Sequence, residues 1–483
     1  MKALTEPVKE LGIYDDLRRD IKRNGITGVT GLTDSARTVF SYAVTEGVRL
    51  FIAADTVRAS QIEEEAYLFG REVYVYPARD MMFYQADLSG NMLIRQRMQA
   101  IKALCEHKAG QELTIITTFD ALMEKMAPIS YITDNILSIK TGDILDIEEL
   151  SARLTDLGYE RGTEAEEPGQ YAVRGGIIDI YPLTEENPVR IELWGDEADS
   201  IREYDALSQR SIEKLKQILI YPATDLVTDE DMRLGAKVRI EAEASRVYDA
   251  LRKEMKTEAA YRLKTYTDQV MEALVCGISI NLSPYICYLY GRTENLLDLI
   301  NIRHAGVIID EPARCEERGH AVWQEWTDSV THRIETGHML PGESDVLIPA
   351  EEVFARLMSM PVLASSMISL HHEDYRYSAE YSVSSQTIGS YNKSFDQLKS
   401  DLERYRKRKS RVVILSPSHT RAKKLTDDLT GLGINAFYSE DEDRILSGGE
   451  IMLTYGHVYK GFEFPDIGFA VISESDIFGG KVK

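Results

Sequence analysis

Cysteine is scarce in this sequence, which has only four in 483 residues: Cys105, Cys276, Cys287 and Cys315. No two of them have the Cys-x-x-Cys spacing of a zinc or redox site, and no histidine cluster lies beside them. His371 and His372, followed by Glu373 and Asp374, suggest a metal site, but side chains adjacent in sequence rarely converge on one ion. We therefore expect reduced, structural thiols and no bound metal.

Long hydrophobic runs are also missing, since no apolar stretch approaches the roughly 18 residues that a membrane-spanning helix requires. We therefore expect a cytoplasmic protein with no membrane partner. Basic residues are outnumbered, with 56 Lys and Arg against 79 Asp and Glu and a formal net charge of -23. Such a field repels phosphate backbones and argues against tight DNA binding. The longest basic run, 404–411, ends a predicted helix, where cations suit the helix dipole.

The sequence does contain a regular alternation of strand-like and helix-like segments over its first 128 residues. Predicted strands cover 26–30, 49–54, 72–76 and 113–117, and predicted helices cover 7–24, 35–46, 56–69 and 92–107. This alternation is typical of a parallel sheet with helices on both faces. We therefore expect an α/β domain over residues 1–128.

The pattern changes beyond residue 128, where segments become short, alternating and punctuated by glycine. A hairpin is predicted over 170–181 with its turn at Gly175-Gly176, and a further strand over 189–194. These segments predict an inserted, mainly antiparallel β-rich domain over 129–218. Helical patterns return over 219–375, the polar segment 376–387 is predicted to be a linker, and 388–483 a small C-terminal α/β domain.

One loop lies where nucleotide-hydrolysing proteins carry the phosphate-binding motif G-x-x-x-x-G-K-[ST], between a predicted strand and helix. It begins at Gly31 and ends at Thr38, but Ala36 replaces the second glycine and Arg37 replaces the lysine. Arginine does not substitute for the compact lysine ammonium at this position. Asp34 adds a negative charge, and we expect it to cap the following helix. The loop is therefore predicted to be inactive in ATP hydrolysis.

A second remnant is the predicted strand over 306–309, which leads into Asp310 and Glu311. In a working nucleotidase the aspartate would organise Mg²⁺, although apolar strands that end in solvated acids are common. Pro312 follows immediately and fits no helicase motif. Two degenerate motifs in this order predict descent from an ATPase, with neither ATP nor Mg²⁺ as a cofactor of this chain.

Two long runs are the most specific part of the sequence: PGQYAVRGGIIDIYP over 168–182 and NPVRIELWGDE over 187–197. Together with 76–84 and 460–479, they make the chain resemble the N-terminal module of the bacterial transcription-repair coupling factors (the Mfd family), itself similar to the excinuclease B subunit. The resemblance covers essentially the whole chain. It implies a degenerate helicase-like (RecA-like) lobe, an inserted domain 2, the return of the first lobe, and a small third domain.

The resemblance also implies a function and its residues. Domain 2 of this family binds the excinuclease A subunit (UvrA), and the matching positions here are Arg174, Arg190 and Trp194. It implies that RNA polymerase, DNA and the ATP-driven motor belong to regions C-terminal to residue 483, so that this chain is the front part of a longer protein. It further implies that a C-terminal domain masks domain 2 in the intact protein.

Local periodicity supports these positions independently. In strand 189–194, alternation places Val189, Ile191 and Leu193 on one face and leaves Arg190 and Trp194 on the other. Arginine and tryptophan on an exposed face match the composition of binding hot spots. The alternative is that Trp194 folds over the sheet edge with Arg190 stacked on it. Two other functions stay open: a divergent ATPase lobe, and a damaged-DNA-binding module like excinuclease B, whose aromatic hairpin is reduced here to 82–85.

Overall fold

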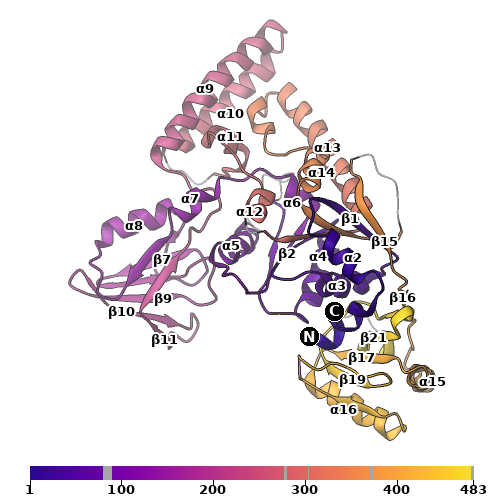
Figure 1. Ribbon diagram of the computed structural model, residues 1–483. Coiled ribbons are helices and arrows are strands. Elements are labelled where there is room, and N and C mark those ends of the chain that lie inside the picture. The colour runs from indigo at the N-terminus through magenta and orange to yellow at the C-terminus, as the bar shows by residue number, and fades with distance from the viewer. Residues whose placement is uncertain (80–89, 277–279, 303, 369–373, 480–483) are drawn as a thin grey trace.

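A seven-stranded parallel sheet is central to the computed structural model, which describes residues 1–79, 90–276, 280–302, 304–368 and 374–479 (Figure 1). Its strand order is β15-β1-β14-β13-β2-β4-β3. Apolar runs such as Val48–Ala53 form these strands because both sheet faces are covered and the whole run is buried. The strands are β1 (Gly25–Thr30), β2 (Val48–Ala53), β3 (Val73–Tyr76), β4 (Leu113–Thr118), β13 (Gly306–Asp310), β14 (Pro361–Ser365) and β15 (Tyr377–Ser382).

Helices cover the two faces of this sheet and create two hydrophobic cores. Ile308 of β13 belongs to the core under α3 and α4, whereas its neighbours Val307 and Ile309 belong to the core under α5, α6, α13 and α14. The helices of the lobe are α1 (Lys2–Thr5), α2 (Tyr14–Asp20), α3 (Asp34–Val44), α4 (Thr56–Ala66), α5 (Gly90–Glu106), α6 (Phe119–Met123), α7 (Ile129–Thr133), α13 (Pro312–Glu335) and α14 (Ala350–Met358).

The N-terminal segment differs from the single helix expected over 7–24. It forms α1, a 3-10 turn over Pro7–Glu10 and then α2, with extended backbone at Leu11 (φ -62°, ψ 130°). Proline starts a helix more readily than it continues one, and Gly12 lowers helix propensity between the two pieces. Val8 and Leu17 are both buried, so the apolar spacing of this segment correctly indicated burial. It did not indicate one continuous helix.

The segment 376–387, expected to be a linker, contains two strands. β15 pairs in parallel with β1 at the edge of the central sheet, and β16 (Gln386–Thr387) pairs with β20 (Phe462–Phe464) of the C-terminal sheet. The apolar side chains of β15 are the half-buried Tyr377, Ala379 and Tyr381, which alternate with exposed polar residues. A serine- and tyrosine-rich edge strand lacks the aliphatic run by which the buried strands were recognised.

Domain 2 is a six-stranded sheet in the order β11-β10-β9-β8-β7-β6, antiparallel except between β6 and β7. One of its faces is covered by α8 (Ile147–Asp156), whose Leu150 and Leu154 share a core with Ile191. The expected hairpin is present and turns at Gly175, where φ is +62°. The strands of this part are β5 (Leu137–Lys140), β6 (Glu160–Arg161), β7 (Gln170–Arg174), β8 (Ile177–Ile180), β9 (Val189–Trp194), β10 (Glu197–Tyr204), β11 (Ser211–Leu215) and β12 (Gln217–Ile220).

The chain enters and leaves domain 2 through one antiparallel pair, β5 and β12, in which Leu137 lies opposite Ile220. A buried ionic cluster sits just beyond this pair. Arg79 and Arg97 both donate to Asp225 Oδ2, at 2.6 and 2.9 Å, and Arg97 also donates to Glu124 Oε2 at 2.8 Å. The cluster fixes the exit of domain 2 to the carboxyl ends of β3 and β4 of the lobe.

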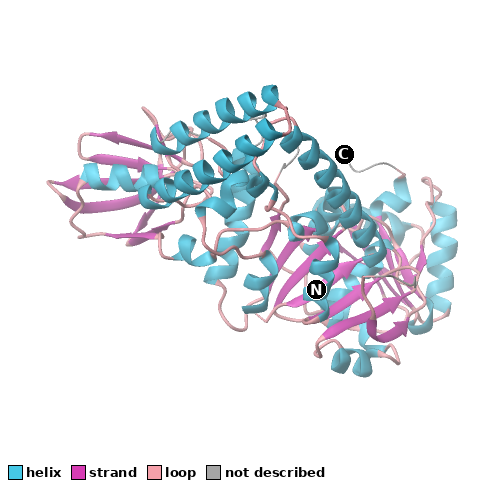
Figure 2. Cartoon of the chain, turned by 90° about the horizontal axis from the view of Figure 1, so that it is seen from above, coloured by secondary structure: helices cyan, strands magenta, loops and turns pink. Residues whose placement is uncertain are grey.

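A long helical hairpin projects from the lobe at the top of Figure 1. It consists of α9 (Glu230–Lys253) and α10 (Thr257–Cys276), within the range 219–375 over which the sequence predicted helical patterns. The chain reverses at Met255, whose φ is +62°. Two short helices follow, α11 (Ile286–Leu289) and α12 (Leu296–Ile302). From above, domain 2 and the C-terminal domain lie at opposite ends of the molecule (Figure 2).

The C-terminal domain, domain 3, contains a six-stranded sheet in the order β16-β20-β21-β17-β19-β18. It is not separated from the lobe, because Val413, Val458 and Phe464 share one core with Leu4 and Leu32. Its elements are α15 (Phe395–Lys407), β17 (Arg411–Ser416), α16 (His419–Gly431), β18 (Ala436–Tyr438), β19 (Ile451–Tyr455), β20 (Phe462–Phe464), β21 (Phe469–Ser473) and α17 (Glu474–Phe478).

The fold class expected from the sequence is confirmed: an α/β chain with a parallel lobe, a mainly antiparallel inserted domain and a small C-terminal α/β domain. Within the described ranges, no helix is both long and apolar enough to cross a membrane.

Candidate functional site

The degenerate phosphate loop joins β1 to α3. Gly31 has a φ of +82°, and a side chain there would place its Cβ 1.9 Å from the Val383 carbonyl oxygen. The residue that precedes the helix is Thr33, whose N–H donates to Ser385 Oγ at 2.8 Å and whose side chain makes no capping bond. Asp34 is the exposed first residue of α3, so the expectation that it caps this helix is wrong. Its carboxylate still adds favourable negative charge to the first turn.

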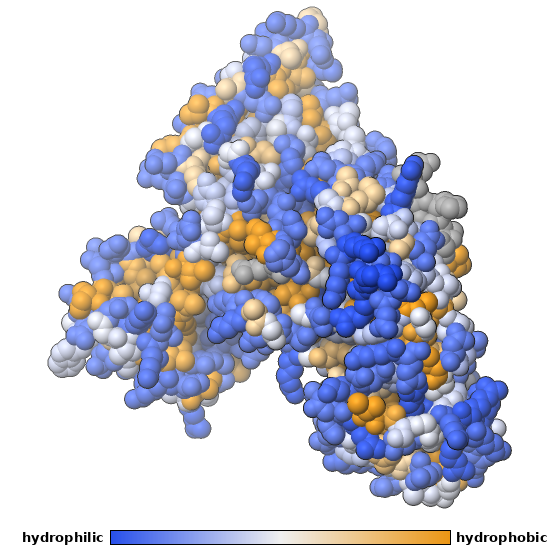
Figure 3. Space-filling model, in the orientation of Figure 1, coloured by the Kyte–Doolittle hydropathy of each residue, from blue (hydrophilic) through white to orange (hydrophobic). Residues whose placement is uncertain are grey.

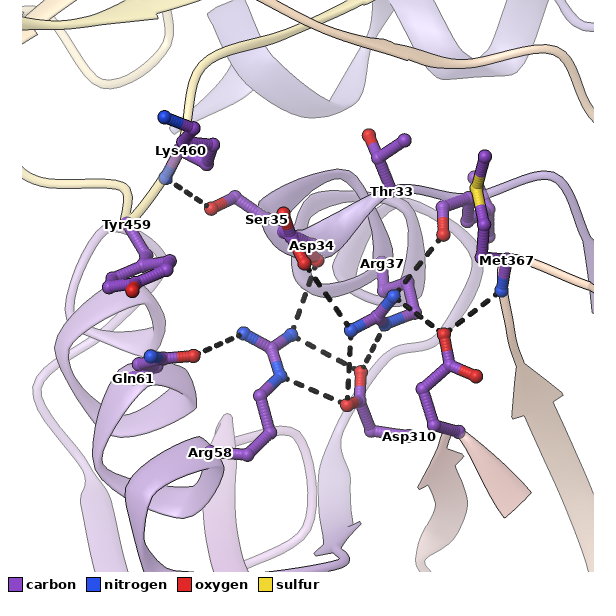
Figure 4. A network of polar contacts seen from close by, with 12 residues as sticks. Thr33, Asp34, Ser35, Arg37, Arg58, Gln61, Asp310, Met367, Tyr459 and Lys460 are labelled. Atoms are coloured by element: carbon purple, nitrogen blue, oxygen red, sulfur yellow. Dashed lines mark hydrogen bonds and ion pairs between the residues drawn. The ribbon is translucent and has the colours of Figure 1, made fainter. Parts of the chain in front are cut away.

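The loop is filled by protein cations and anions (Figure 4). Arg37 donates through Nε to Asp310 Oδ1 at 2.7 Å and through Nη1 to Glu311 Oε1 at 2.8 Å. Arg58 of α4 approaches Asp310 from the other side, with Nε 2.9 Å from Oδ2 and Nη2 3.2 Å from Oδ1. The arginine at the lysine position of the motif therefore binds the aspartate that would otherwise organise Mg²⁺.

This ion cluster is almost completely removed from water. Burial alone would raise the pKa of Asp310, but the charges of Arg58 and Arg37 and their hydrogen bonds outweigh burial and lower that pKa to about 2. Burial raises the pKa of Glu311, which begins α13 with a left-handed backbone (φ +54°) and accepts the Met367 N–H at 3.0 Å. Asp310 is thus held as a carboxylate between two guanidinium groups.

Domain 3 closes the remaining side of the loop. Thr38, at the hydroxyl position of the motif, donates to the buried Glu65 and accepts from Arg58 Nη2 at 3.3 Å. The Tyr459 N–H donates to the same Glu65 at 3.2 Å, and the Lys460 N–H donates to Ser35 Oγ at 3.0 Å. Domain 3 therefore contacts both helices that supply the arginines, α4 through Glu65 and α3 through Ser35.

The six positions singled out from the two degenerate motifs have different roles in the structure. Arg37, Thr38, Asp310 and Glu311 meet in one cluster, whereas Gly31 shapes the backbone and Ala36 is only a buried helix residue. Sequence reasoning missed Arg58, since an arginine within a predicted helix carries no local signal of a partner 252 residues away.

Three potential metal ligands also lie within 4.8 Å of one another: Glu316, His320 and Asp374. His320 Nε2 is 2.8 Å from Asp374 Oδ2, and the Asp374 N–H donates to Glu316 at 3.1 Å. These contacts join α13 to the segment that follows β14. The neighbouring 371–373, and the aromatic segment 82–85, lie outside the described residues.

The second candidate site is the face of the domain 2 sheet opposite α8, called the outer face below. In β9, Val189 and Ile191 are buried on the α8 side, so that Arg190 and Trp194 belong to the outer face. Arg174 and Asp179 reach this face from β7 and β8, because Asp179 is directly opposite Arg190 across the sheet. The outer face thus combines residues from three strands.

Arg174 and Arg190 meet on one carboxylate. Arg190 donates to Asp179 Oδ1 and Oδ2 at 2.6 and 2.9 Å, and Arg174 donates to Oδ2 at 2.6 Å. Asp179 is only 1% exposed, and the Arg190 guanidinium lies 4.6 Å from the ring centre of Tyr204. Sequence reasoning missed Asp179 as a site residue. The alternation of side chains along β8, and the pairing of β8 with β9, would have placed Asp179 on the same face as Arg190. Arg174 also donates to Glu164 Oε1 at 3.1 Å, so the two arginines are fixed in position by two carboxylates and the cluster carries no net charge.

Trp194 lies at the end of β9 and is 83% exposed. It is not packed over the sheet edge, and Arg190 stacks on Tyr204 instead, which removes the alternative in which the two residues form a satellite core. Glu192 lies between them on the strand and is bound by Arg202 and by Ser200 Oγ. Arg190 and Trp194 therefore share a face without touching. A large aromatic side chain exposed to water beside an ordered pair of arginines is typical of a protein-binding surface.

Comparison with known proteins defines the class of this domain. Residues 137–226 match the family described as the UvrB interaction domain. The match contains Arg174, Asp179, Arg190 and Trp194 and ends one residue beyond Asp225 of the ionic cluster.

The chain as a whole resembles one kind of protein. It is 28% identical, over 98% of its length, to the transcription-repair-coupling factor of Bacillus subtilis (strain 168), and 26% identical, over 100%, to that of Staphylococcus aureus (strain MRSA252). Over essentially its whole length the chain is therefore similar to transcription-repair-coupling factors. It spans 39% and 41% of the lengths of these two relatives.

Proposed function

We propose that this chain is a recruiting adaptor whose domain 2 docks the excinuclease A subunit (UvrA) and thereby links a stalled RNA polymerase to nucleotide excision repair. The observation that carries the proposal is the outer face, where the exposed Trp194 lies beside an ordered pair of arginines in a domain that matches the UvrB interaction domain. Polymerase binding and ATP-driven movement on DNA would belong to the remaining three fifths of the longer relatives.

The filled phosphate loop supports an adaptor over an enzyme. Both cations of the loop are paired with buried carboxylates, and domain 3 hydrogen-bonds to its helix. The competing proposal, a divergent ATPase lobe, requires nucleotide binding at this loop. A fluorescent ATP analogue titrated in the presence of Mg²⁺ tests it, and saturable binding would favour the enzyme.

A titration against the purified excinuclease A subunit tests the adaptor. Trp194→Ala and Arg190→Glu should each weaken binding about thirtyfold, since hot-spot substitutions cost about 2 kcal/mol. Tyr261→Ala is the matched control, because Tyr261 is a similarly exposed aromatic residue (71%) on α10, far from domain 2. Circular dichroism confirms that each variant is folded.

The outcomes separate the candidate functions. No binding by the parent chain sinks the adaptor proposal, as does loss of binding in Tyr261→Ala equal to that in Trp194→Ala. If the chain instead binds DNA with an affinity that falls steeply with salt, a damaged-DNA-binding function is favoured.

A further inference from the structure

The outer face continues beyond the residues found from sequence, onto the loop between β10 and β11. Leu207 in this loop is 97% exposed, more than any other large hydrophobic residue described. Single exposed leucines are common on protein surfaces, so exposure alone identifies nothing. The order of this loop and its connection to Arg190 distinguish it.

The loop at 205–210 is held by hydrogen bonds that centre on Asp205. Its carboxylate accepts the Ser208 N–H at 2.7 Å, its carbonyl accepts the Gln209 N–H at 2.8 Å, and its own N–H donates to the Arg210 carbonyl at 2.9 Å. Gln209 adopts a φ of +58° and bonds back to the Ala206 carbonyl at 2.9 Å. Leu207 is therefore presented by a preformed turn, which lowers the entropy lost when a partner binds.

The same loop is hydrogen-bonded to the arginine pair of the outer face. Arg190 Nη2 donates to Gln209 Oε1 at 2.9 Å while its other contacts hold Asp179. The turn that carries Leu207 and the arginine proposed to meet the partner are therefore parts of one hydrogen-bonded unit.

A second apolar residue flanks the loop. Arg202 is opposite both Arg190 and Lys214 in the sheet, and directly opposed residues share a face. The pairing of β10 with β11 shifts by one residue at this point, because Tyr204 is opposite Ser211 and Ile212 is the extra residue of a β-bulge. The two residues of the bulge oppose Tyr204, on which Arg190 stacks, so Ile212 lies at this edge of the outer face, and it is 54% exposed. Figure 3 shows hydrophobic residues interspersed with polar ones over domain 2. The outer face thus has Trp194 at one end, two arginines in the middle, and Leu207 with Ile212 at the other end.

We infer that Leu207 and Ile212 form a second apolar anchor of the docking face, on the other side of Arg190 from Trp194. This inference rests on the proposed docking of the excinuclease A subunit. The turn that carries Leu207 is joined to the docking face through the hydrogen bond from Arg190 to Gln209, so the two apolar ends set the length and orientation of the surface that the partner presents.

The test is a titration of the full chain with purified excinuclease A subunit. Leu207→Ala and Ile212→Ala should each weaken binding about tenfold, the effect of an anchor worth roughly 1.4 kcal/mol. Met255→Ala is the control, because Met255 is exposed to a similar degree (86%) at the tip of the α9–α10 hairpin. Asp205→Ala, which disorders the turn without removing Leu207, should weaken binding by a smaller factor.

Each outcome bears on a separate claim. If Leu207→Ala and Ile212→Ala bind like the parent chain while Trp194→Ala is weakened, the second anchor is refuted and the adaptor function stands. If the parent chain itself does not bind, the adaptor proposal fails and the anchor fails with it. Equal weakening by Met255→Ala would also refute the anchor.

Discussion

Asp310→Asn is expected to destabilise the lobe strongly while changing one oxygen to nitrogen. The folded protein holds the pKa of Asp310 at about 2, against an ordinary value of 3.8. A difference of nearly two pKa units corresponds to roughly 2 kcal/mol favouring the folded state. Removing the charge also leaves two buried guanidinium groups short of a counter-ion, and breaking a buried pair in this way typically costs about 3–5 kcal/mol. We therefore expect a loss of about 2–5 kcal/mol.

The tryptophans provide the assay. In a Trp194→Phe background, the fluorescence comes from Trp323 and Trp326 of α13, the helix that begins at Pro312. Urea unfolding followed by this signal should show a lower midpoint for Asp310→Asn. Asp328→Asn is the control, since Asp328 is exposed on the same helix and bonds only to Gln324 in the described contacts.

The pH dependence of the free energy of unfolding provides a second measurement on the same variant. Because the folded-state pKa lies below the unfolded one, the contribution of Asp310 is complete above pH 3.8 and disappears as the pH falls towards 2. The difference between the parent chain and Asp310→Asn should therefore shrink over this range. If the parent chain and Asp310→Asn have free energies of unfolding at pH 7 that agree within about 0.5 kcal/mol, the stabilising role of the ion cluster is refuted.

Three further predictions concern other parts of the chain. Burial raises the pKa of Glu343 to about 7, so its contribution to the free energy of unfolding is complete below pH 4.5 and falls by about 3 kcal/mol as the pH rises through 7. Glu343→Gln should abolish this dependence of the urea midpoint on pH. A variant with the same pH profile as the parent chain would contradict this role of Glu343. Gly31→Ala should lower the urea midpoint, because its Cβ would meet the Val383 carbonyl; a midpoint equal to that of the parent would show that the loop can relax. Restoring the motif with Ala36→Gly and Arg37→Lys should not produce binding of a fluorescent ATP analogue, and saturable binding would show that the two replacements alone had inactivated the loop.

The sequence predicted those features whose signals are local. Apolar runs such as 49–54 and the Gly175-Gly176 turn identified the parallel lobe and the antiparallel insertion, because each signal lies within a few residues. Strand β15 was missed because an edge strand needs fewer aliphatic residues. The break of the helical segment at Met255 was missed because a left-handed residue other than glycine carries no clear signal in sequence.

In the candidate sites, too, the features with local sequence signals were predicted and those that depend on distant residues were not. The degenerate loop and the outer face were located from motifs, but the residues that explain them are partners distant in the chain: Arg58 for Asp310, Glu65 for Tyr459, and Gln209 for Arg190. Ion pairs and hydrogen bonds between elements depend on how the elements pack, and no spacing rule in a single sequence reports them. The close attachment of domain 3 was hidden for this reason. Some of its contacts use backbone N–H groups, which every residue has, and others are apolar side chains that pack into a core shared with the lobe.

The paired strands at the base of domain 2 make this inserted domain replaceable. Leu137 and Ile220 lie opposite each other, so the two ends of the insertion are only about 5 Å apart. A short turn could therefore close the lobe if the insertion were removed, without altering the order of strands in the central sheet. On the proposed function, the unit that binds the partner could be exchanged as a block, by evolution or by a protein engineer. To keep the same orientation on the lobe, the exchange would have to preserve the ionic cluster at Asp225 and the contacts of Glu185 with Arg95 and Lys102 of α5.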